Sequence, residues 1–244
     1  MKLWNSLKDF WNNRSKKQKI GLVVAGALAA VLLCTMVVGV IIDSFRTNLV
    51  DNGSFESWTF GNPSGWTIYD YRKDYNQDAT NTSYGKDSKE ALSGNASAYL
   101  QTVDNDIRYC QEIKVASSSY YKITASFKTD GVIEEGQGAN ISIYDAKVAF
   151  PEAMTLDSNG EWVTFTAYGV TADDQKKLEL AVGLGGFGAT SSGKIWIDNV
   201  SMEKVAAVPE GQPVYKLYEE KKEDDVSSWG LKSTTTSCCK SWKS

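Results

Sequence analysis

The chain has 244 residues, 42% of them hydrophobic and 23% charged, a composition that is ordinary for a folded protein and excludes global disorder. Its formal net charge of −4 is unevenly distributed, because residues 1–19 carry a local charge of +5 and the rest therefore about −9, which argues against nucleic-acid binding by the folded part. Histidine is absent, which removes the commonest general base and nearly every zinc-hydrolase site.

The first predicted element is a transmembrane α-helix at residues 20–42, a run of 23 residues without a charge. A helix of that length reaches about 35 Å, which is enough to cross a hydrocarbon layer of about 30 Å. A cleaved signal peptide would have a shorter apolar core and a small-residue cleavage site, and the run ends VVGVIID instead. The sequence therefore predicts a single-pass anchor.

The orientation of this anchor is predicted from the cluster RSKKQK that directly precedes it. Basic residues stay on the cytoplasmic side, so residues 1–19 are expected in the cytoplasm and the C-terminal domain outside the cell. Leu3, Trp4, Leu7, Phe10 and Trp11 recur at helical spacing, which is typical of a helix lying in the headgroup layer. A solvated basic segment is the alternative for residues 1–19.

Residues 47–205 read as one all-β domain. Short segments with period-two alternation are separated by Gly, Asn, Asp and Ser, which indicates an antiparallel two-sheet sandwich. Residues 206–244 combine a charge run with Ser/Thr-rich low complexity and are predicted to be a linker and a disordered tail. The predicted strands are 97–103, 109–115, 121–128, 139–146, 162–169, 177–184 and 194–202.

Four motifs of the β domain occur in an order that resembles a known family. The domain opens with NLVDNGSFE (48–56), followed by Trp66, has two paired strands at 109–131, then WVTFTAYG, and closes with GKIWIDNVSMEK (193–204). This pattern resembles the jelly-roll carbohydrate-binding modules of families four, nine and twenty-two. One departure is that Ser117–Ser119 replace the usual glycine in the turn before the central tyrosine. The resemblance implies a jelly-roll sandwich and sugar binding.

Two carboxylates in the predicted terminal strands need a partner, because acidic residues are poor strand formers. These modules often carry a structural Ca²⁺ that links the terminal strands, and the resemblance implies Glu56 and Asp198 as its side-chain ligands, with backbone oxygens near Ser93–Asn95. The alternative is that both carboxylates are hydrogen-bonded or solvated without a metal.

A sugar-binding face needs aromatic rings for the apolar side of a pyranose and polar groups for its hydroxyls. In ANISIYDA, alternation places Ile141 and Ile143 on one side of a strand and Asn140, Ser142 and Tyr144 on the other, so the ring of Tyr144 is expected to face solvent. Further tyrosines fall in a predicted loop, IYDYRKDY, and any one of them could equally be ordinary packing. The predicted carbohydrate-binding residues are Tyr69, Tyr71, Arg108, Gln111, Asn140 and Tyr144.

Together these features predict a non-catalytic, membrane-anchored module that binds a poly- or oligosaccharide. The alternative is a structural or adhesive cell-surface protein that uses the same sandwich for protein partners at the cell envelope. A glycosidase needs two carboxylates at a fixed separation in a cleft, whereas Glu134–Glu135 and Asp173–Asp174 fall in predicted turns, so no catalytic residue is predicted.

Overall fold

The computed structural model describes residues 10–44, 47–133, 137–150 and 158–219. The chain divides into two compact units, Met1–Thr47 and Asn48–Ser244. Parts of two predicted segments, residues 1–9 and residues 220–244, lie outside the described residues.

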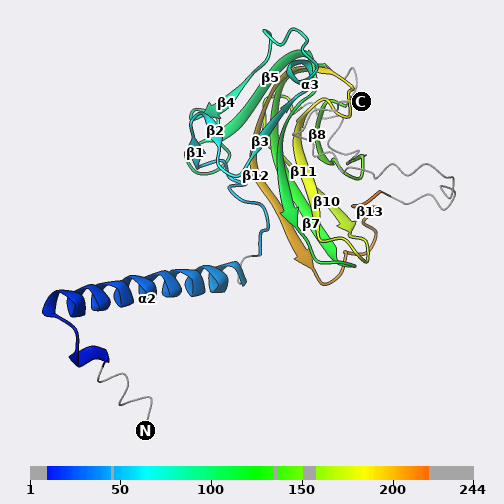
Figure 1. The fold of residues 1–244 in the computed structure, drawn as a ribbon. Helices are drawn as coiled ribbons and strands as arrows, with labels where there is room; N and C mark the ends of the chain where they lie inside the picture. The colour runs from blue at the N-terminus through cyan, green and yellow to red at the C-terminus, as the bar shows by residue number, and fades with distance from the viewer. Residues whose placement is uncertain (1–9, 45–46, 134–136, 151–157, 220–244) are drawn as a thin grey trace, which may run out of the picture. The chain divides into compact units, whose positions relative to one another are not determined.

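The first unit contains helix α2, Lys16–Ser44, which includes the predicted helix at 20–42 (Figure 1). Its start is a capping box, because the Ser15 hydroxyl accepts from the Gln18 amide and the Gln18 side chain accepts from the Ser15 amide. A helix at this position is thus confirmed. Within the described residues, however, no helix combines the length and apolarity needed to cross a membrane, so the transmembrane prediction is not confirmed.

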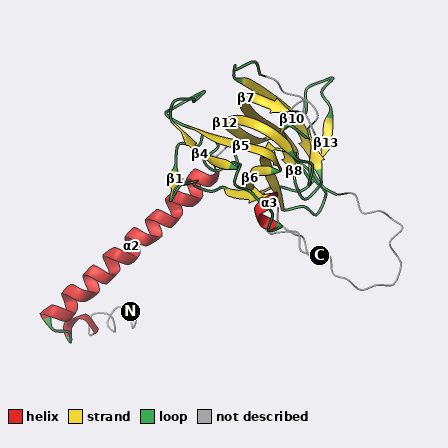
Figure 2. Ribbon diagram, turned by 90° about the horizontal axis from the view of Figure 1, so that it is seen from above, coloured by secondary structure: helices red, strands yellow, loops and turns green. Residues whose placement is uncertain are grey.

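The second unit is a sandwich of two sheets, which confirms the all-β prediction (Figures 1 and 2). One sheet has six strands in the order β13-β10-β7-β12-β5-β4 and the other has five in the order β3-β6-β11-β8-β9. From β5 to β12 the chain alternates between the sheets, except for the short β9, as in a jelly roll. The predicted strands correspond to β5 (Ser97–Asn105), β6 (Ile107–Lys114), β7 (Tyr120–Ile133), β8 (Ala139–Ile143), β10 (Val163–Val170), β11 (Lys177–Leu184) and β12 (Ser191–Val205). The two strands at 109–131, β6 and β7, lie in different sheets, so the prediction that they pair with each other is wrong.

Six short strands and one helical turn were not predicted. The region read as a tyrosine-rich loop forms a strand followed directly by a helical turn, which Asp70 caps by accepting from the Lys73 amide. These additional elements are β1 (Trp58–Thr59), β2 (Asn62–Pro63), β3 (Thr67–Asp70), α3 (Tyr71–Asp74), β4 (Ser83–Asp87), β9 (Val148–Ala149) and β13 (Val214–Lys216).

The core lies between the sheets and follows the alternation of each strand. In β7 the inward positions are Tyr121, Ile123, Ala125 and Phe127, and in β11 they are the leucines and valine at 178, 180, 182 and 184. All of these side chains are at most 1% exposed. The intervening positions of β11 therefore point to the outer side of the five-stranded sheet.

The opening segment is not the strand that was predicted. Asn48 forms only an isolated bridge with Glu203, and Phe55 adopts a φ of 53°, so the chain turns before Glu56. Phe55 is fully buried and stacks on Trp66 with 5.2 Å between ring centroids. A Cβ on Gly53 would lie 2.0 Å from the Val200 carbonyl oxygen, so the glycine lets the segment touch the closing strand.

The folded unit also extends past residue 205, where a linker was predicted. β13 pairs in parallel with β10, and Leu217 is fully buried in the core. Gly169 makes room for it, since a Cβ there would lie 2.3 Å from Leu217 Cδ2. Three residues of strand in a polar segment carry too little periodicity to predict, so the sequence did not reveal this pairing.

Candidate functional site

The outer side of the five-stranded sheet is called here the outer face. Five of the six predicted sugar-binding residues lie on it or pack against it, namely Tyr69, Tyr71, Arg108, Asn140 and Tyr144. The strand register places Tyr69 opposite Arg108, Arg108 opposite Gly183, and Gly183 opposite Asn140. One row across β3, β6, β11 and β8 thus carries a phenol, a guanidinium and an amide. Segments far apart in the sequence supply these three groups.

Three aromatic rings lie together on this face. The centroids of Tyr69 and Tyr144 are 5.8 Å apart, and those of Tyr144 and Phe187 are 5.5 Å apart. The Arg108 guanidinium carbon lies 5.4 Å from the Tyr144 centroid and 4.8 Å from that of Phe187. These are cation–π distances, so the arginine supports both rings. Phe187 lies in the loop after β11, where no sequence pattern marks it.

Arg108 is fully buried, and its charge is matched by an equally buried Asp106. Arg108 Nε donates to Asp106 Oδ1 at 2.7 Å and Nη2 to Oδ2 at 3.2 Å, while Nη1 donates to the Ser142 hydroxyl at 2.9 Å. A buried charge is tolerated only with such pairing. Asp106 Oδ2 also accepts from the Gly188 amide, which ties the Phe187 loop to the pair.

Two glycines allow the arginine to lie across the sheet. A Cβ on Gly183 would lie 2.3 Å from the Ile107 carbonyl oxygen and 2.7 Å from Arg108 Cα. A Cβ on Gly186 would lie 2.6 Å from Arg108 Nη2. Side chains at either position would therefore displace Arg108 from beneath the rings.

Asn140 contributes an amide whose oxygen has no hydrogen-bond donor within the part of the chain that the structure describes. Its nitrogen donates to the carbonyls of Gly185 at 2.7 Å and Gly138 at 3.1 Å, which fixes the side chain. The residue is fully buried. A buried acceptor left unpaired costs about 1–3 kcal/mol, so this oxygen is suited to a hydroxyl donor from a ligand or water.

The outer face is more enclosed than predicted. Tyr144 lies on the expected side of β8 but is only 7% exposed, so the expectation that its ring faces solvent is wrong. Tyr69 is 2% exposed, and burial, followed by the neighbouring Tyr144, raises the pKa of its hydroxyl far above the usual range. Tyr71 and Phe187 are half-buried and pack against this cluster, so they form its accessible rim.

Gln111 does not belong to the outer face. Its side chain donates to the carbonyls of Asp51 and Gly65, both at 2.9 Å, and accepts from the Asp51 amide at 2.7 Å. Alternation explains the error, because Gln111 and Arg108 are three residues apart in β6 and so point to opposite sides. Gln111 instead holds the opening segment against the sheet.

The two predicted calcium ligands face the same loop. Asp198 is fully buried and accepts from the amides of Leu92, Ser93 and Asn199 at 2.7–3.0 Å. Glu56 Oε1 accepts from the amides of Asn95 and Ala96 at 2.8 and 3.1 Å. The loop thus presents N–H groups to both carboxylates, as the hydrogen-bonded alternative expects.

A cation would nevertheless suit this pair of carboxylates. Burial raises the pKa of Asp198, and the charge of Glu56 raises it further although the backbone hydrogen bonds oppose this. Two nearby carboxylates therefore repel each other, and a hard cation would relieve that repulsion. The described residues contain no cluster of three or more His, Cys, Asp or Glu side chains arranged for a metal, so a cation here would need further oxygen ligands besides these two carboxylates.

Comparison with known proteins gives likenesses in structure. No protein-family model matches the chain, and no curated protein matches its sequence. A CBM4 structure is 18% identical with a TM-score of 0.44, covering 64% of this chain and 99% of that one. A CBM61 module in complex with β-1,4-galactotriose is 16% identical with a TM-score of 0.42, covering 66% and 100%.

A cyclase from Fischerella sp. TAU is 14% identical with a TM-score of 0.48, covering 67% of this chain and 99% of its own. Sugar-binding modules and an enzyme thus have comparable likeness to this chain. At these identities and scores, the comparisons assign neither a ligand nor a reaction to it.

Proposed function

We propose that the β-sandwich is a non-catalytic glycan-binding module whose contact surface is the outer face of the five-stranded sheet. One observation carries the proposal: three aromatic rings, a guanidinium and an unpaired amide oxygen converge on a single side of one sheet. Aromatic faces stack on the C–H side of a pyranose, and fixed polar groups bond its hydroxyls.

The rim residues are the first points of contact in this proposal. Tyr71 and Phe187 are half-buried, whereas Tyr69, Tyr144 and Arg108 lie beneath them. Arg108 and Asp106 would act by holding the rings in place. The Asn140 side-chain oxygen would accept a hydrogen bond from a sugar hydroxyl only if the sugar displaced the side chains that bury it. A poly- or oligosaccharide is the expected ligand.

The second candidate is a structural or adhesive protein that uses the sandwich to contact other proteins. The burial of Tyr69, Tyr144 and Arg108 favours it, because enclosed rings stabilise a fold whether or not a ligand exists. Binding of a glycan through Tyr71 and Phe187 would support the glycan-binding module, and its absence would support the structural or adhesive protein.

Affinity electrophoresis of the full-length chain through gels containing xylan or β-1,4-galactan tests the proposal. The wild type should be retarded, and Phe187→Ala should abolish retardation, because a stacking contact is worth about 1–3 kcal/mol by analogy with base stacking and millimolar binding amounts to only about −4 kcal/mol. Phe60→Ala is the matched control, since Phe60 is fully exposed in the β1–β2 turn and lies outside the outer face.

A wild type that passes unretarded through every neutral polysaccharide gel would favour the structural candidate. Equal retardation of the wild type and Phe187→Ala would mean that the glycan binds elsewhere than at this rim. Melting temperatures of both variants show whether a loss of binding is a loss of folding.

We retain calcium as a proposal for the pair of Glu56 and Asp198. Millimolar CaCl₂ should raise the melting temperature of the chain, EDTA should reverse the rise, and Glu56→Gln should remove both responses. Glu161→Gln is the control, because Glu161 is an exposed acid in a turn. If the wild type melts at the same temperature with CaCl₂ and with EDTA, backbone hydrogen bonds alone account for the two carboxylates.

The proposed contact surface contains no residue of the membrane anchor predicted for residues 20–42, since all its side chains come from the second unit. Display on the outer side of a cell membrane, with residues 1–19 in the cytoplasm, stays a prediction from the charge pattern of the sequence.

A further inference from the structure

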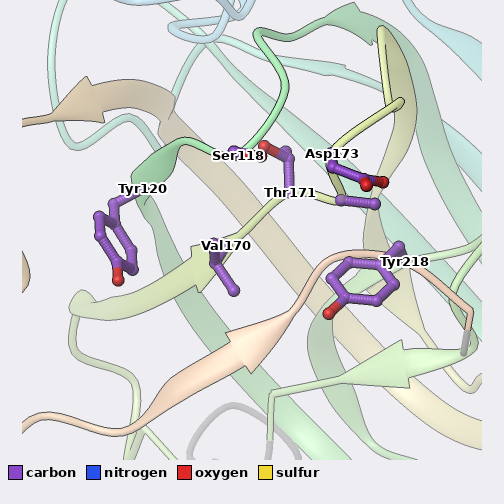
Figure 3. A pocket seen from close by; sticks show the side chains of 7 residues that line it. Ser118, Tyr120, Val170, Thr171, Asp173 and Tyr218 are labelled. Carbon is purple, nitrogen blue, oxygen red and sulfur yellow. The ribbon is translucent and has the colours of Figure 1, made fainter.

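A cavity of about 410 Å³ opens beside the six-stranded sheet, where β7 begins and β10 ends (Figure 3). This volume lies in the range of small-molecule sites, about 300–1,000 Å³. The cavity shares no residue with the outer face of the five-stranded sheet. Its lining consists of Ser118, Tyr120, Val170, Thr171, Ala172, Asp173 and Tyr218.

The cavity exists because β13 brings Tyr218 to Tyr120. The register places Val170 opposite both Tyr120 of β7 and Lys216 of β13. The next residue, Leu217, is fully buried, donates from its amide to the Val170 carbonyl at 3.0 Å, and accepts from the Gln175 side chain at 2.8 Å. Tyr218 therefore follows an anchored residue and is held in position.

The opposite wall is fixed by hydrogen bonds between two turns. The Thr171 hydroxyl accepts from the Ser119 amide at 3.0 Å and donates to the Ala116 carbonyl at 2.7 Å. The Ser118 amide donates to the Ala172 carbonyl at 2.9 Å. Because these bonds already fix the backbone around the cavity, ligand binding would lose little conformational entropy in ordering that backbone.

The chemistry of the lining fits a sugar ring. Tyr120 is 41% exposed and Tyr218 is half-buried, and Figure 3 shows the two rings on opposite sides of the cavity with Val170 between them. Asp173, which is exposed, and Thr171 lie along one side in the same view. Open aromatic faces with an acceptor beside them suit C–H stacking and hydroxyl bonding.

We propose that this cavity is a second saccharide subsite, which takes a neutral sugar residue by stacking on Tyr120 and Tyr218 and hydrogen bonding to Asp173. The carboxylate selects against acidic sugars, because it would repel a uronate or a sulfate group. The proposal rests on the glycan-binding function proposed above and adds a separate site on the other sheet.

Amide chemical shifts of the ¹⁵N-labelled full-length chain test the two sites independently. Titration with β-1,4-galactotriose or xylotriose should shift the amides of Thr171–Asp173 in a saturable way. Tyr218→Ala should weaken this response about tenfold or more, as expected for a lost stacking contact. Tyr218→Ala should leave any shift of the Gly188 amide, beside Phe187, unchanged. Phe187→Ala should weaken the shift at Gly188 and leave the shifts at Thr171–Asp173 unchanged.

Tyr218→Phe should keep the response if stacking dominates, and Asp173→Asn should weaken it without altering the fold, because the carboxylate is exposed. Shifts at Gly188 without shifts at Thr171–Asp173 would overturn the second subsite and leave the proposed function standing. Absence of saturable shifts at both places would overturn both. Saturation by tetramethylammonium instead of the sugars would show an aromatic cation site and overturn the saccharide assignment.

Discussion

Replacing Asp106 with alanine should destabilise the β-sandwich by about 3–5 kcal/mol, the cost of leaving one partner of a buried ion pair uncompensated. Arg108 and Asp106 are both fully buried, 2.7 Å apart, so the guanidinium left behind would keep its hydrogen bond to the Ser142 hydroxyl but lose its buried carboxylate. Urea unfolding followed by tryptophan fluorescence measures the loss. The rings of Tyr144 and Phe187 should also lose order, since Arg108 supports them.

The matched control is Glu112→Ala, which breaks the Lys177–Glu112 pair at 2.6 Å with both side chains about 60% exposed. Exposed pairs contribute at most about 1 kcal/mol. The double variant Asp106→Ala/Arg108→Met should recover much of the loss, because it removes both charges. If Asp106→Ala costs no more than Glu112→Ala, Arg108 reaches solvent by itself and the pair does not support the outer face.

Phe55→Ala should lower the free energy of unfolding of the β-sandwich by about 3–5 kcal/mol, as for other truncations of buried aromatic side chains. Phe55 is fully buried, stacks on Trp66 and lies 5.8 Å from the Tyr109 ring. Its loss would free the opening segment from the core. The measurement is again the free energy of unfolding in urea.

Phe60→Ala is an unusually close control for this change. Phe55 and Phe60 are both phenylalanines in the left-handed region, with φ values of 53° and 50°, but Phe60 is fully exposed. Any effect of alanine on the strained backbone is therefore shared, and the difference reports burial alone. Equal losses for the two variants would mean that the backbone conformation, and not the core contact, determines the cost.

Much of the fold could be predicted from the sequence because long strands repeat their pattern. β7 and β11 alternate over enough residues for one side to be recognised as core, and the same alternation identified Tyr144 and Asn140 as outward-facing. The short strands β9 and β13 contain too few residues for any period to appear.

The outer face could be predicted only in part, since contacts between distant segments decide it. Alternation within β6 would have separated Gln111 from Arg108, so that error was avoidable. Asp106 lies two residues before Arg108, so alternation could also have placed its carboxylate beside the guanidinium. The role of Phe187 was not predictable in this way, because the loop after β11 brings it beside Arg108 and no spacing in the sequence indicates that contact. Burial of Tyr69 and Tyr144 likewise depends on what packs above a strand, which a strand pattern does not contain.

The parallel pairing of β13 with β10 bears on how separate copies of the protein stay apart. β13 pairs with Tyr168, Gly169 and Val170, the last three residues of β10, so without residues 206–219 the N–H and C=O groups on that side of these three residues would be open to another chain. A very short final strand offers little template for further pairing. The segment after residue 205 thus shields the end of β10, and a fragment that ended at residue 205 would expose these three backbone positions and the core site of Leu217.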